Sequence, residues 1–153
     1  SDSIIFENNL AIDIENTGYG SYLNAPRIVG MRGGITRYHK VLNNIFIDCK
    51  KHMIEFPNDD NFSNGNVFCN PRPGYLKIKE NGSDLLLDLQ AWNQLFGWEE
   101  DGRVTRAEAD LDTENLLLSI DYEGLKELKE INAGPFTEME NIENLNIDPR
   151  KNK

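Results

Sequence analysis

The chain has 153 residues, of which 39% are hydrophobic, and a formal net charge of -10 at pH 7. This length corresponds to one domain, and the acidity argues against a nucleic-acid partner, because phosphate binding needs a basic surface. No stretch approaches the roughly 20 apolar residues that cross a bilayer. We therefore expect a soluble protein without a membrane-spanning segment, in the cytoplasm or secreted or periplasmic. No motif indicates a cofactor or a metal.

Residues 6–13 (FENNLAID) and 41–48 (VLNNIFID) nearly repeat one another, and residues 63–70 (SNGNVFCN) form a weaker third copy. The offsets between the copies are 35 and 22 positions. One turn of a parallel β-helix takes roughly 20 to 30 residues, so the second offset fits one turn and the first fits one turn with an insertion. The repeat predicts an all-β fold, a right-handed parallel β-helix.

In chain order, residues 4–79 read as short strands separated by polar turns. Aligning the copies predicts two inward columns, Leu10–Ile45–Val67 and Ile12–Ile47–Cys69, and two outward columns, Ala11–Phe46–Phe68 and Asp13–Asp48–Asn70. A second strand family aligns residues 53–56 with 75–78 and places Glu55 beside Lys77, a favourable pair. The 19 asparagines suit the turns of such a fold, because asparagine tolerates left-handed backbone and bonds nearby peptide groups.

The pattern changes from residue 84. Residues 85–96 are predicted to form an amphipathic helix that Gly97 ends, with Trp92 packed toward the core rather than offered to a sugar. A strand over 110–120, a short helix over 121–130 and a polar tail over 141–153 follow. We therefore divide the chain into residues 1–83, with an inserted loop at 17–40, and a C-terminal cap of residues 84–153.

Three segments carry a resemblance to a known group: NNIFID (43–48), NGNVF (64–68) and LDLQAW (87–92). They resemble the last turns of right-handed parallel β-helix carbohydrate-active enzymes, nearest to β-helix glycoside hydrolases of the β-xylosidase type. The resemblance spans roughly residues 4–100. It implies glycoside hydrolysis of an oligo- or polysaccharide, xylose-containing or of another plant type. Such enzymes are longer, so it also implies that an upstream β-helix segment, or a partner chain, covers the first turn.

Asp13 and Asp48 are the catalytic candidates. On neighbouring strands their Cα atoms would lie roughly 4.8 Å apart, and retaining glycosidases use two carboxylates about 5 to 5.5 Å apart. Glu55 is a reserve acid on the next face. The alternative is that both aspartates are solvated strand residues or turn formers. If the catalytic acids lie elsewhere, these residues form one wall of the site.

The inserted loop supplies the candidates for substrate binding, which are Arg32, Arg37, Tyr38 and His39. Tyrosines stack on sugar rings, and arginines donate paired hydrogen bonds to hydroxyls or carboxylates. Surface salt bridges are the alternative for the arginines. A polysaccharide lyase acting on uronates would use the basic residues Arg27, Arg32, Arg37 and Lys40 instead. A β-helix module that binds carbohydrate without catalysis stays open as a third class.

Overall fold

The computed structural model describes residues 3–21, 36–112 and 117–123. This part consists mostly of strands with one helix, which confirms the prediction of an all-β fold. Nine of its strands belong to three successive repeats of three strands each. They are β1 (Ile5–Glu7), β2 (Leu10–Ile12) and β3 (Tyr19–Gly20); β4 (Lys40–Leu42), β5 (Ile45–Ile47) and β6 (Ile54–Phe56); and β7 (Phe62–Asn64), β8 (Val67–Cys69) and β9 (Leu76–Glu80).

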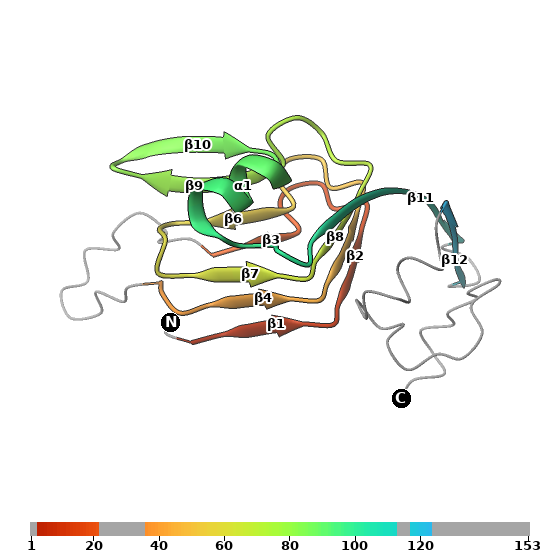
Figure 1. Cartoon of the computed structure of the whole chain (residues 1–153). Helices are drawn as coiled ribbons and strands as arrows, with labels where there is room; N and C mark the ends of the chain where they lie inside the picture. Colours follow the sequence, from red (N-terminus) through yellow and green to blue (C-terminus); the bar gives the residue numbers. More distant parts are fainter. Residues whose placement is uncertain (1–2, 22–35, 113–116, 124–153) are drawn as a thin grey trace.

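Equivalent strands of the three repeats pair in parallel and build three sheets (Figure 1). The sheets are β1-β4-β7, β2-β5-β8 and β3-β6-β9. Two of them are extended by antiparallel hairpins. β10 (Ser83–Leu87) pairs with β9, while β11 (Arg103–Asp112) pairs in parallel with β8 and antiparallel with β12 (Leu117–Glu123).

The register predicted from the repeats is confirmed. Ile45 is the Cα partner of both Leu10 and Val67, and Ile47 is the partner of both Ile12 and Cys69. In the neighbouring sheet Glu55 lies opposite Lys77. These pairings follow from the sequence because each repeat places the same short strand at the same offset.

The prediction of which side chains of the β2-β5-β8 sheet point into the interior was wrong. Phe46 and Phe68 point into the interior, where their rings stack with centroids 5.9 Å apart and planes 7° apart. Side chains alternate along a strand, so Ile45 and Ile47 point to the opposite face, although both are fully buried too. The sequence could not orient this strand, because Ile-Phe-Ile has no polar side to mark the solvent face.

The loop predicted over residues 17–40 begins later than expected and ends before Lys40, the first residue of β4. Tyr19 and Gly20 form β3 and pair with Ile54 and Glu55, so residues 17–21 belong to the first repeat. The insertion between the first and second repeats therefore follows β3. Residues 22–35 lie outside the described residues.

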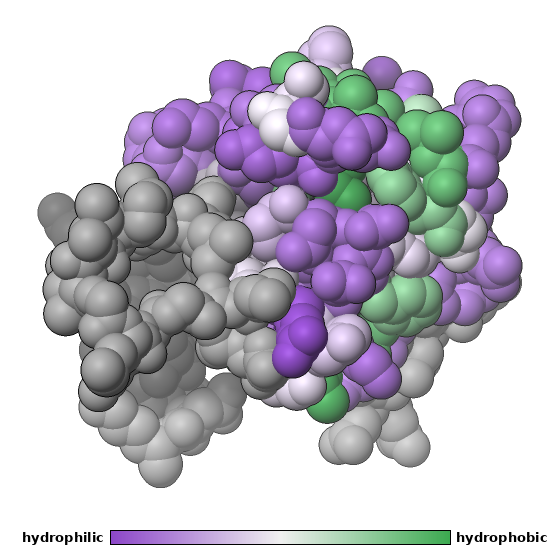
Figure 2. All heavy atoms as spheres, turned by 90° about the vertical axis from the view of Figure 1, so that its left-hand side faces the viewer, coloured by the Kyte–Doolittle hydropathy of each residue, from purple (hydrophilic) through white to green (hydrophobic). Residues whose placement is uncertain are grey.

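The interior between the three sheets is closely packed with large side chains. The buried members of this cluster are Val41, Phe46, Cys49, Met53, Ile54, Phe56, Phe68, Tyr75, Leu76, Ile78, Trp92 and Trp98. Cys49 and Cys69 are both buried and free, as small core residues. Most described residues on the face shown in Figure 2 are hydrophilic, and hydrophobic groups gather in its upper right half, inside a hydrophilic margin.

The single helix of the described residues, α1 (Leu89–Phe96), lies over the end of the stack beyond the third repeat (Figure 1). The Asp88 side chain accepts a hydrogen bond from the Ala91 N–H at 2.8 Å and starts the helix. Gly97, in left-handed conformation with φ 68°, ends it as predicted. Trp92 is fully buried and its indole Nε1 donates to Ser63 Oγ at 3.0 Å, so it is a core residue as expected.

The helix begins later than residue 85. Residues Leu85 to Leu87 belong to β10, because Asn81-Gly82 makes the tight turn of a β-hairpin and returns the chain along β9. Beyond α1, the described residues of the predicted strand over 110–120 belong to two antiparallel strands, β11 and β12, and residues 121–123 belong to β12 rather than to a helix. Residues 124–130 and the tail over 141–153 lie outside the described residues. Within the described ranges no helix is long and apolar enough to cross a membrane.

Candidate functional site

Each strand of the β2-β5-β8 sheet ends in a residue with left-handed backbone, and we call these three residues the acidic corner: Asp13, Asp48 and Asn70. Their φ angles are 47°, 52° and 54°. Aspartate and asparagine tolerate this conformation better than most residues. The Asp13 N–H donates to the Ile47 carbonyl at 3.0 Å, which continues the sheet into the corner. Asp13 and Asp48 therefore follow neighbouring paired strands at equivalent positions, as the aligned repeats predicted.

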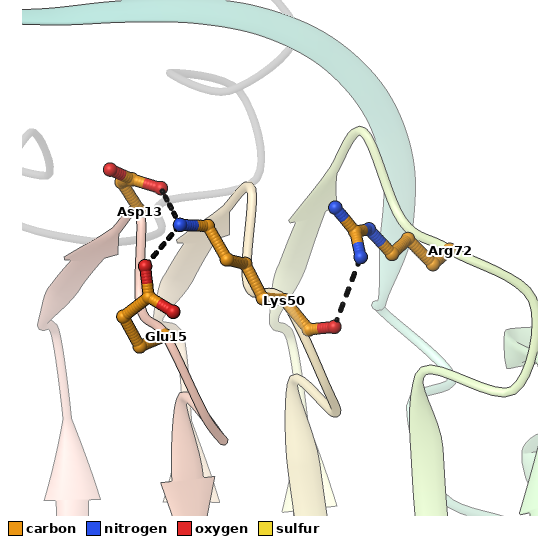
Figure 3. A network of polar contacts seen from close by, with 4 residues as sticks. All are labelled: Asp13, Glu15, Lys50 and Arg72. Carbon is orange, nitrogen blue, oxygen red and sulfur yellow. Dashed lines mark hydrogen bonds and ion pairs between the residues drawn. The ribbon is translucent and has the colours of Figure 1, made fainter.

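Lys50 lies beside Asp13, and Arg72 lies beside Lys50 (Figure 3). Lys50 Nζ lies 3.8 Å from Asp13 Oδ1 and is hydrogen-bonded to Glu15. The Glu15 hydrogen bond, and then the charge of Asp13, raise the pKa of Lys50 above its usual value. Arg72 Nη1 donates to the Lys50 carbonyl at 3.3 Å, and so a second cation stands beside the first.

Asp48 has a different partner from Asp13. Its Oδ1 accepts a hydrogen bond from Asn70 Nδ2 at 3.1 Å. Asn70 also bridges to β11, since its Nδ2 donates to the Ala107 carbonyl and its Oδ1 accepts from the Ala107 N–H. The acidic corner is thus held between two repeats and the strand that follows them.

A cavity of about 940 Å³ lies at this corner. The described residues that line it are Leu10, Ala11, Ile12, Asp13, Ile14, Asp48, Lys50, Arg72, Ala109 and Asp110. Carboxylates accept hydrogen bonds, lysine and arginine donate them, and the aliphatic side chains offer apolar contact. This wall can therefore hold a small molecule that carries many hydroxyl groups.

The exposure of the acidic corner bears on catalysis. The side chain of Asp13 is 71% exposed, and that of Lys50 is 40% exposed. A general acid must keep its proton at working pH, which enzymes achieve by burying the carboxyl group or by placing it next to another carboxylate. The exposed position of Asp13 excludes the first device.

Glu55 does not join the acidic corner. It lies on β6 in the neighbouring sheet, where Lys77 Nζ is 2.9 Å from its Oε1 and 3.0 Å from Asp84 Oδ2. The predicted pair of Glu55 and Lys77 is thus formed. Lys77 lowers the pKa of Asp84, and the hydrogen bond to Glu55 is the main cause that raises the pKa of Lys77.

The predicted binding residues lie on the segment that leads into β4. Tyr38 is 53% exposed, and the Arg37 guanidinium carbon lies 5.0 Å from the centre of its ring. His39 is only 2% exposed, and its Nδ1 is 2.7 Å from Tyr19 Oη. Burial raises the pKa of Tyr19 to about 12.

None of these residues is among the described residues that line the cavity, so the structure does not bring them together with the aspartates. Because the His39 side chain is buried, it has little surface left to contact a substrate. Arg32 and Arg27 lie outside the described residues. Lys40 is exposed, on β4.

A second polar column, which we call the asparagine ladder, lies at the other end of the same strands: Asn9, Asn44 and Asn66. Asn44 and Asn66 are fully buried, and Glu99 closes the column by accepting hydrogen bonds from Asn66. Burial raises the pKa of Glu99 to about 7, against the effect of its hydrogen bonds. The repeat predicted asparagine at the corners, but Glu99 was missed because it follows the helix and does not share the period.

Among the described residues, no group of three or more His, Cys, Asp or Glu side chains could hold a metal ion. The comparisons with known proteins found no matching family model, no matching curated protein and no matching solved structure.

Proposed function

We propose that the chain is part of a right-handed parallel β-helix and that it binds a saccharide in the cavity at the acidic corner. Three parallel sheets made from consecutive repeats support the first half of this proposal, because each repeat then forms one rung that crosses all three sheets. The resemblance of the repeat segments to carbohydrate-active β-helices supports the second half.

The observation that carries the binding proposal is the composition of the cavity wall. Two stacked carboxylates, Asp13 and Asp48, stand beside Lys50 and Arg72, with aliphatic side chains from β2 adjacent to them. A sugar ring presents hydroxyl groups around its edge and C–H groups on its faces. Carboxylates can accept from vicinal hydroxyls, the cations can donate to ring or hydroxyl oxygens, and the aliphatic surface can contact a face.

Retaining glycoside hydrolysis is the second candidate, and a specific observation favours it. Asp13 and Asp48 follow paired residues on neighbouring strands, which sets their Cα atoms roughly 4.8 Å apart. This approaches the separation of about 5 to 5.5 Å between the two carboxyl groups of a retaining enzyme. In this mechanism one carboxylate attacks the anomeric carbon while the other donates a proton to the leaving oxygen. A lyase acting on uronates is a further alternative, with Lys50 and Arg72 in place of the loop residues that the sequence analysis named for it.

The test is a calorimetric titration of the protein, first with neutral xylo-oligosaccharides and then with oligouronates. We expect Asp13→Asn and Asp48→Asn to weaken saccharide binding about tenfold or more, because each removes a carboxylate acceptor. Asp59→Asn is the matched control, since it changes an exposed aspartate outside the cavity. Equal affinity of all variants would contradict the proposed site.

The same samples separate the candidate functions. Release of reducing ends from the neutral oligosaccharide, abolished by either cavity variant, identifies a hydrolase. Binding without release of product identifies a binding module. An unsaturated product from the oligouronate identifies a lyase. If Tyr38→Ala weakens binding and the aspartate variants do not, the saccharide lies on the segment before β4 and the proposed cavity is wrong.

A further inference from the structure

The asparagine ladder has a direction. The Asn9 N–H and Nδ2 donate to Asn44 Oδ1 at 2.9 and 3.1 Å, and the Asn44 N–H and Nδ2 donate to Asn66 Oδ1, both at 2.9 Å. The Asn66 N–H and Nδ2 then donate to the two carboxylate oxygens of Glu99, at 3.0 and 2.6 Å. Each side-chain oxygen therefore accepts from the repeat before it.

The side-chain amides of Asn44 and Asn66 also each donate one hydrogen bond to the preceding repeat. Asn44 Nδ2 donates to the Phe6 carbonyl at 2.9 Å, and Asn66 Nδ2 donates to the Val41 carbonyl at 2.8 Å, both in the preceding repeat. Asn9 instead donates to the Glu7 carbonyl in its own repeat. Among the described residues, no donor bonds to Asn9 Oδ1. Asn9 thus lacks the two contacts that a preceding repeat supplies to Asn44 and Asn66.

The two ends of the ladder therefore differ. Glu99, when ionised, only accepts hydrogen bonds, so the ladder stops there. On the same side, Trp92 of α1 covers the interior and packs against Phe56, with ring centroids 6.0 Å apart. At the opposite end β1, β2 and β3 are each the last strand of their sheet. Three parallel edges and an unused amide oxygen face the same direction.

We propose that this edge binds one further rung, an extended polypeptide that runs parallel to β1, β2 and β3 and carries an asparagine opposite Asn9. Its N–H and side-chain amide donate to Asn9 Oδ1, and one of its carbonyls accepts from Asn9 Nδ2. The interface continues the stacking already present between the described repeats. This inference does not depend on saccharide binding.

A second copy of the chain does not fit the same edge. Two copies that meet edge to edge with their ladders aligned would bring Asn9 Oδ1 against its symmetry equivalent, an acceptor facing an acceptor. Two copies meeting head to tail require the other end, which α1 covers. The direction of the ladder therefore selects an occupant whose asparagine N–H and Nδ2 are free to donate to Asn9 Oδ1. A preceding rung of the same kind presents these donors.

The experiment adds such a rung. A copy of residues 38–59 replaces residues 1–2 in the full chain, directly before Ser3, so that the 22-residue offset continues. This junction repeats the step from Asp59 to Asp60. Ile5, Lys40 and Phe62 are Cα partners in the β1-β4-β7 sheet, so 3, 38 and 60, each two residues earlier, are equivalent positions. The equivalent of Asn44 in the added copy then lies opposite Asn9.

We expect the added rung to raise Tm by about 4 °C or more and to slow hydrogen exchange of the β1 and β2 amides. The matched control carries Asn44→Asp in the added copy only. Aspartate has the same shape but donates no hydrogen bond from its carboxylate. At pH 7.5 this control should therefore show little of the rise in Tm.

Two results would overturn the proposal. Equal Tm values for the two added copies would show that the amide oxygen of Asn9 does not select its partner, and no rise with either copy would show that the edge does not accept a rung. Light scattering of the unaltered chain gives an independent check. A dimer that Ile5→Lys dissociates would assign the edge to a second copy instead.

Discussion

Two polar columns flank the same three strands, β2, β5 and β8, and they differ in nearly every contact. The asparagine ladder precedes the strands, and its Asn44 and Asn66 are completely buried. The acidic corner follows the strands, and its Asp13 side chain is 71% exposed. Both columns repeat at the same offsets, so the spacing between neighbours is set by the same sheet.

The difference shows how burial selects the side chain that can be stacked. An amide donates and accepts, so identical amides satisfy one another in a column from which water is excluded. A carboxylate only accepts, and stacked carboxylates repel. The acidic corner therefore requires solvent, the cation of Lys50 and the amide of Asn70. One column holds repeats together, and the other leaves hydrogen-bonding capacity for a ligand.

The largest effect is expected from Asn44→Asp, which puts a member of the exposed column into the buried one. The new carboxylate loses the donors to Asn66 Oδ1 and the Phe6 carbonyl and faces both acceptors without water. We expect a loss of about 3 kcal/mol or more in the free energy of unfolding at pH 7.5, measured by urea denaturation. The loss should shrink at pH 5, where the new carboxyl group takes up a proton. A pH-independent or negligible loss would contradict the role of the ladder.

A smaller effect is expected from Glu99→Gln, which should change how the free energy of unfolding depends on pH. Burial raises the pKa of Glu99 from its ordinary 4.5 to about 7 in the folded protein. The folded state thus binds more protons than the unfolded state, and this group lowers stability as pH rises from about 4.5 to 7. Across this pH range the free energy of unfolding of the wild-type chain should fall by on the order of 3 kcal/mol relative to that of Glu99→Gln.

The comparison requires a matched neutral substitution nearby. Glu100→Gln removes an exposed neighbouring carboxylate and should keep the wild-type pH profile. Stability measured from pH 4.5 to 8 in all three proteins separates the two glutamates. A Glu99→Gln profile parallel to that of the wild type would show that Glu99 does not titrate in this range.

The smallest effect on stability is expected from Asp48→Asn, the reverse exchange. Asparagine also tolerates the left-handed backbone at this position and can still accept from Asn70 Nδ2. The free energy of unfolding should change by less than about 0.5 kcal/mol, while saccharide binding weakens. A large loss of stability would mean that the acidic corner, like the ladder, is built to hold the repeats.

The repeat was sufficient to predict the strand register, because one offset, 35 or 22 positions, applies to all strands of two successive repeats. It could not predict which way Phe46 points, since both its neighbours are isoleucines and all three are buried. Residues 85–87 are leucines that suit a helix, and the Asn81-Gly82 turn overrides that preference by starting a hairpin.

The candidate site could be predicted only in part. The stacking of Asp13 and Asp48 followed from the repeat, but Lys50 and Arg72 did not, because their approach depends on the corner that each repeat makes after its strand. His39 reads as a loop residue next to arginine and tyrosine. Its burial depends on Tyr19, 20 positions earlier, which no local pattern reveals.

Gly18 sets a limit on how this chain can vary. A Cβ atom placed there would lie 2.6 Å from the ring of Phe46 and 2.9 Å from the Met53 carbonyl oxygen. The ring could give way only by disturbing its stack with Phe68, and the carbonyl is fixed by the backbone. The exchange of Asp48 for asparagine at the acidic corner is expected to cost little stability, whereas position 18 does not admit a single additional carbon atom.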